Sequence, residues 1–64
     1  MAEYRLEGHY YDEENERRSI TLSVVAPTRE SAQYRFRHRF RNFNKAKIDK
    51  VYKRGTDGKF QKMK

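Results

Sequence analysis

The sequence predicts a small α+β domain of the order strand, strand, helix, strand, in which a three-stranded sheet carries one helix packed on one face. Residues 3–11 and 17–26 alternate apolar and polar side chains, as half-buried strands do. Apolar residues between positions 32 and 43 recur instead at spacings of three and four, which is typical of a helix. A chain of 64 residues has room for one such domain with one small core.

The first two strands are predicted to form an antiparallel hairpin. The segment EYRLEGHYY (residues 3–11) is followed by DEENE (residues 12–16), which lacks apolar residues and contains Asp and Asn, two residues that favour turns. RRSITLSVVA (residues 17–26) is rich in β-branched residues. The short connection favours antiparallel pairing of these two strands.

The segment YRFRHRFRNF (residues 34–43) allows two interpretations. As a strand, it would alternate rings with arginines. As a helix, it would begin near Thr28, a suitable N-cap after Pro27, with Glu30 in the first turn where the helix dipole favours an anion. We favour the helix, because the alternation fails at Asn42 and because one helical stripe collects Ala32, Phe36, Phe40 and Phe43.

A third strand is expected in AKIDKVYKR (residues 46–54), with a bulge because Ile48 and Val51 are three residues apart. A helix that crosses the sheet favours parallel pairing of this strand with the first. Residues 1–54 would form the domain. GTDG (residues 55–58) is a turn, and KFQKMK (residues 59–64) is expected to be a basic tail, with a short fourth strand as the alternative.

These elements predict one compact core. Its inward residues would be Tyr4, Leu6, Tyr10, Ile20, Leu22, Val24, Ala26, Ala32, Phe36, Phe40, Phe43, Ile48 and, if the bulge permits, Val51.

The charge is distributed unevenly along the chain. Residues 1–16 contain six acids and one base, giving −5, whereas residues 17–64 contain 15 bases and three acids, giving +12, for a net charge of +7. A basic body attracts polyanions, so the composition favours nucleic acid as the partner. The alternative, which the charge alone leaves open, is an ordinary solvated surface.

Arginines and a tyrosine on the outer helix face indicate phosphate contacts combined with base stacking, as used on RNA and single-stranded DNA. We expect RNA or a single strand rather than duplex DNA, without strong sequence preference. The candidate nucleic-acid-binding residues are Tyr34, Arg37, His38, Arg41, Lys45, Lys47, Lys50 and Arg54.

No enzyme, metal or cofactor is predicted. Cysteine is absent, His9 and His38 lie on different elements, and the acids of residues 12–16 lack the spacing of a calcium loop. No apolar run approaches the roughly 20 residues that cross a bilayer, and the first residues do not resemble a signal peptide, so we expect a cytoplasmic protein, in the host cytoplasm if a phage encodes it.

The chain resembles the archaeal large-subunit ribosomal protein LX family over residues 4–53. The resemblance rests on YRLEGHY near the start, VVAPTRESA at the strand-to-helix junction, and NKAKIDKVYK as a basic turn leading into an I-x-x-V strand. The Gly-Ser-x-His segment that follows the helix in that family has no counterpart in RNFNKAK. The resemblance implies an RNA-binding β-β-α-β protein.

The layout is also similar to that of small phage and mobile-element proteins. This similarity implies an alternative function: an accessory protein that binds and modulates a host protein. The protein partner would dock on the sheet edge or on the acidic loop of residues 12–16.

Overall fold

The computed structural model describes all residues, 1–64, as a four-stranded sheet with one helix. The sheet has the order β2-β1-β3-β4, and every neighbouring pair is antiparallel. The α+β prediction is therefore confirmed, with a short fourth strand. The elements are β1 (Ala2–Tyr11), β2 (Arg17–Ala26), α1 (Arg29–Arg39), β3 (Lys47–Arg54) and β4 (Phe60–Lys62).

The segment of residues 34–43, for which the sequence allowed a strand or a helix, belongs to helix α1 as far as Arg39. The helix begins where the capping residues predicted it. Thr28 is the N-cap, and its hydroxyl accepts a hydrogen bond from the backbone N–H of Ser31 at 3.1 Å. The C-cap is Phe40, whose N–H donates to the carbonyl of Phe36. Phe43 therefore lies beyond the helix, although its ring still packs edge-on against Phe40 at 5.1 Å.

The core forms where α1 crosses the inner face of the sheet. Phe36 is 1 % exposed and packs over Gly8, where the missing side chain lets the ring approach the backbone. Ile20, Leu22 and Val24 of β2 are only half-buried, because no strand lies beyond this edge. The buried core consists of Tyr4, Leu6, Ala26, Ala32, Phe36, Phe40 and Val51; Tyr10, Ile20, Leu22, Val24, Phe43 and Ile48, also expected inward, are half-buried.

The predicted parallel pairing of the third strand with the first is wrong: β3 is antiparallel to β1. The helix connects β2 to β3, so the crossover makes those two strands parallel to each other, and β1 lies between them and opposes both. The predicted bulge is present. The register passes from Glu7 opposite Lys50 to Gly8 opposite Ile48, which leaves Asp49 as the extra residue.

The preferred prediction of a basic tail at the C-terminus is wrong, and the alternative of a short fourth strand is confirmed. Phe60–Lys62 pair with β3, and the N–H of Met63 donates to the carbonyl of Val51 at 2.8 Å. Gly58, with φ of 82°, permits the tight turn before the strand. The guanidinium of Arg5 lies 5.1 Å from the ring centroids of Tyr52 and Phe60, so these few contacts hold β4 in place.

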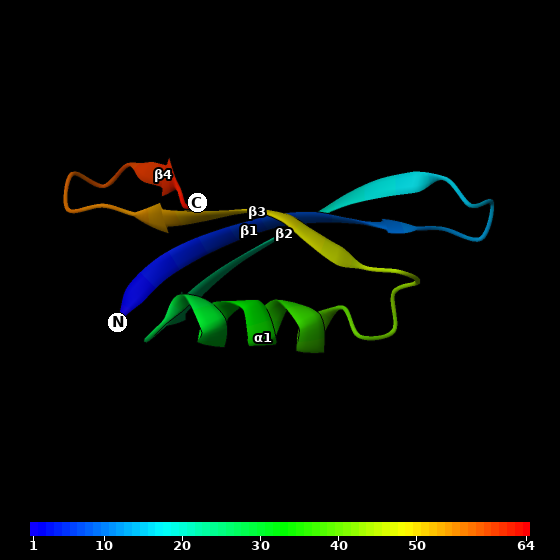
Figure 1. Ribbon diagram of the computed structural model, residues 1–64, viewed down its shortest axis with the longest axis horizontal. Helices are drawn as coiled ribbons and strands as arrows, with labels where there is room; N and C mark the ends of the chain where they lie inside the picture. The colour runs from blue at the N-terminus through cyan, green and yellow to red at the C-terminus, as the bar shows by residue number, and fades with distance from the viewer.

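The molecule is elongated, with principal extents of 41 × 18 × 16 Å. Figure 1 shows the β1–β2 loop and the β3–β4 turn at opposite ends of the long axis, with α1 beneath the middle of the sheet. The helix thus leaves both ends of the sheet uncovered. Helix α1 is neither long enough nor apolar enough to cross a membrane.

Candidate nucleic-acid interface

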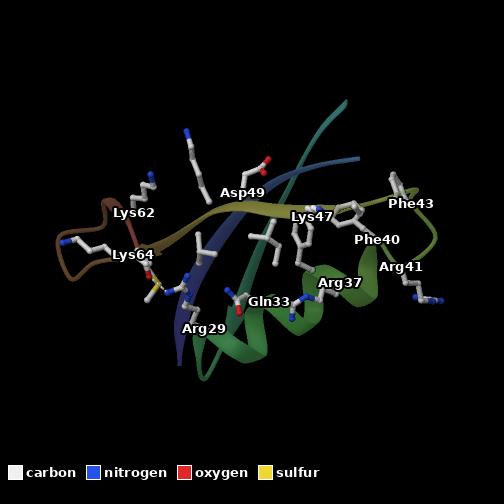
Figure 2. A pocket seen from close by; sticks show the side chains of 16 residues that line it. Arg29, Gln33, Arg37, Phe40, Arg41, Phe43, Lys47, Asp49, Lys62 and Lys64 are labelled. Carbon is white, nitrogen blue, oxygen red and sulfur yellow. Dashed lines mark hydrogen bonds between the residues drawn. The ribbon is translucent and has the colours of Figure 1, made fainter. Parts of the chain in front are cut away.

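A groove of about 560 Å³ runs between α1 and β3. Figure 2 shows β3 on one side, α1 on the other, the C-terminal Lys62 and Lys64 at one end, and Arg41 and Phe43 at the opposite end. Phe36, Phe40, Ala46, Ile48, Val51 and Met63 contribute apolar surface to it. The groove exists because α1 packs mainly over β1 and β2, leaving part of β3 uncovered.

The rim of this groove is strongly basic. Seven cationic side chains line it against a single acid, Asp49. None of the seven forms an ion pair with an aspartate or glutamate side chain, since the ion pairs of the protein involve other cations. Arg29 and Arg41 donate to backbone oxygens, and the charged groups of the other five are available to an anionic ligand. The groove cations are Arg29, Arg37, Arg41, Lys47, Lys50, Lys62 and Lys64.

The one acid of the groove is already engaged on the outer face of the sheet. One carboxylate oxygen of Asp49 lies 2.7 Å from Nδ1 of His9 and 3.2 Å from the Arg17 guanidinium. The hydrogen bond from His9, with a smaller contribution from the Arg17 charge, lowers the pKa of Asp49 below its ordinary value. The bulge places Asp49 toward these partners, so its negative charge does little to offset the groove cations.

Four of the eight residues predicted from sequence meet in the groove: Arg37, Arg41, Lys47 and Lys50. The Arg41 guanidinium donates to the carbonyl of His38 at 2.8 Å, which fixes its stem at the end of α1. Arg37 and Arg41 line the groove from the helix side, whereas Lys47 and Lys50 line it from β3. The register sets these two lysines opposite His9 and Glu7 of the outer sheet face.

The other four predicted residues lie outside the groove. Tyr34 is 66 % exposed on α1 and stacks on His38, with centroids 6.0 Å apart and planes at 14°. Lys45 occupies the loop before β3 with φ of 56°. Arg54 is held at the β3–β4 end by Glu3 at 2.9 Å and by the carbonyl of Gly58.

Three groove cations were not among the predicted residues: Arg29, Lys62 and Lys64. Arg29 opens α1, and its guanidinium donates to the backbone oxygen of Lys64, which joins the first helical turn to the C-terminal residues. Pairing of β4 is what brings these lysines to the groove. The Asp-Gly turn signal before them was the one sequence feature that could have indicated this placement.

Within the acidic loop of residues 12–16, the charge of Asp12 is compensated by hydrogen bonds to its carboxylate. Asp12 accepts hydrogen bonds from the backbone N–H groups of Glu14 and Glu16, and from Nε of Arg18 at 2.8 Å. The backbone hydrogen bond from Glu16, followed by the bond from Arg18, lowers the pKa of Asp12. Asp12 therefore organises the hairpin turn, in agreement with the turn that the sequence predicts for residues 12–16.

Comparisons with known proteins do not assign this chain to a family. No family model, curated protein or solved structure matches the chain. The resemblance to the archaeal ribosomal protein LX family stays a prediction.

Proposed function

We propose that this protein is a non-enzymatic nucleic-acid-binding module that holds RNA or single-stranded DNA in the groove between α1 and β3. The observation that carries the proposal is the set of seven groove cations, none of which forms an ion pair with an aspartate or glutamate side chain. Arginine suits phosphate because its planar guanidinium can donate two parallel hydrogen bonds. Phosphate contacts of this kind give affinity without reading sequence.

Tyr34 and His38 add a surface for a nucleobase beside the groove. They occupy the solvent side of α1, three and one residues from Arg37 on the same helix. An unpaired base can stack on the exposed Tyr34 ring, whereas a base within a duplex cannot leave its stack without cost. A strand held by Arg37 could place a base there, which favours single-stranded nucleic acid over duplex.

Charge reversal tests the groove directly. The Arg37→Glu/Lys47→Glu variant is expected to lower affinity for a single-stranded oligonucleotide by at least about a hundredfold, because it removes two phosphate contacts and adds two repulsive ones. Lys53→Glu/Lys59→Glu is the matched control, since it changes the net charge equally at exposed residues outside the groove. Equal losses in the two variants would show that net charge, and not the groove, determines binding.

A protein partner is the second candidate, since the acidic loop offers a docking surface distinct from the groove. Glu13 and Glu14 have no ion-pair partner there, unlike Asp12 and Glu16. Glu13→Lys/Glu14→Lys should strengthen nucleic-acid binding through the added charge but abolish a contact with a basic protein partner.

A further inference from the structure

The free edge of β2 is a surface that the groove does not use. β2 ends the sheet on its side, and its ten residues pair with β1 in a continuous register without a bulge. From Ser19 to Ala26 it has no charged residue and no proline, so it lacks the devices by which exposed edges normally resist pairing. An edge of this kind accepts an added strand through its backbone groups.

Two arginines of α1 lie above this edge. At about 100° per residue, Arg35 and Arg39 are on the opposite side of Phe36 from Gln33 and Arg37, which line the groove over β3. Because α1 packs on β2 and β1, the side away from β3 faces the β2 edge. Both arginines are exposed, and neither has a carboxylate partner.

A second copy of this chain fits the edge poorly. Antiparallel pairing of two β2 strands about a two-fold axis would set two α1 helices side by side, with Arg35 and Arg39 of both facing one another. The only acid of α1, Glu30, lies on the groove side and could not separate them. Each copy also carries a net charge of +7, so electrostatics oppose this dimer.

We infer that the β2 edge binds an extended acidic segment of another protein, added to the sheet as a fifth strand. Glutamates at alternate positions of that segment would face α1, where their methylenes can cover the half-buried Ile20, Leu22 and Val24 while their carboxylates reach Arg35 and Arg39. Small polar residues at the other positions would face the outer side of the sheet beside Ser19, Thr21 and Ser23. The surface is separate from the proposed nucleic-acid groove.

The probe for this surface is a capped peptide of about seven residues that alternates threonine with glutamate, compared with its lysine counterpart. Only the glutamate peptide should bind, and the changes in backbone amide NMR shifts should be confined to β2 and to the turns of α1 that carry Arg35 and Arg39. Arg35→Glu/Arg39→Glu should weaken the glutamate peptide at least about tenfold and allow the lysine peptide to bind. Arg37→Glu/Arg41→Glu, the matched groove variant, should bind the glutamate peptide as the unmodified protein does.

Each of these results would overturn the inference: no binding, shifts centred on the groove, equal affinity in the Arg35→Glu/Arg39→Glu variant, or displacement of the peptide by a single-stranded oligonucleotide. A dimer in sedimentation that the peptide does not dissociate would assign the edge to a second copy instead. Loss of oligonucleotide binding in groove variants leaves this inference untouched, so its failure is distinct from that of the proposed function.

Discussion

The ring of Phe36 lies so close to Gly8 that a Cβ atom added at Gly8 would be 2.8 Å from its Cζ. The same Cβ would also collide with the carbonyl oxygen of Lys47 on β3. One glycine thus lets the helix approach β1 and lets the bulged β3 pass beside it. The groove between α1 and β3 depends on this contact, since it sets the distance between the two elements.

Gly8→Ala should therefore destabilise the fold by about 2 kcal/mol or more, because backbone atoms as well as the Phe36 ring must move. Urea unfolding followed by circular dichroism measures the change. Gly55→Ala is the control, since its added Cβ would meet the movable Asp57 side chain at 3.1 Å. Similar stabilities of the two variants would contradict the close packing of helix on sheet.

Acid should weaken the fold through Asp12 and Asp49. Both have a pKa lowered below the ordinary 3.8, by hydrogen bonds present only in the folded protein. Their stabilising contribution is complete above that value and is lost as the pH falls through the lower pKa of the folded state. The melting temperature should drop below about pH 4, and Asp12→Asn/Asp49→Asn should flatten that drop; an unchanged profile would show that neither hydrogen bond matters.

Tyr34→Ala should reduce affinity for a single-stranded oligonucleotide by about fivefold to a hundredfold, the usual value of one stacked base. Tyr34→Phe keeps the ring and should bind normally. Neither change should affect stability by more than about 0.5 kcal/mol, because Tyr34 is 66 % exposed. Fluorescence anisotropy measures the binding, and an undiminished affinity in Tyr34→Ala would remove stacking from the proposal.

Phe60→Ala tests whether β4 supplies cations to the groove. The substitution removes the ring that lies 5.1 Å from the Arg5 guanidinium and should release β4 from β3. Lys62 and Lys64 would then leave the groove, and oligonucleotide affinity should fall about tenfold or more. Hydrogen exchange at Met63 reports the release. Faster exchange with unchanged affinity would show that these lysines make no contact.

Local features of the sequence were sufficient for the hairpin, the helix start at Thr28 and the β3 bulge. Their signals lie within a few residues of one another. The direction of β3 was missed because the crossover rule applies to the strands that the helix joins, β2 and β3, and the sequence does not show which strand lies between them. Strand β4 was only the alternative to a tail, because Phe60 and Met63 are the only residues of that segment that offer apolar surface to bury.

The candidate site was predictable only in part, for the same reason. Arg37 and Arg41 are close in sequence, and helix periodicity places them together. Lys62 and Lys64 join them only through pairing of β4, which a pattern of charges cannot reveal. Arg54 appeared equivalent to the other cations in sequence, but its ion pair with Glu3 assigns it to the far end of the sheet.

The salt dependence of oligonucleotide binding tests the central claim most directly. If about six of the seven groove cations contact phosphates of a single strand, the logarithm of the association constant should fall with the logarithm of salt concentration at a slope of about −4. The Arg37→Glu/Lys47→Glu variant should have a slope shallower by more than one. A slope near zero, or one that the variant does not change, would contradict phosphate binding in the groove.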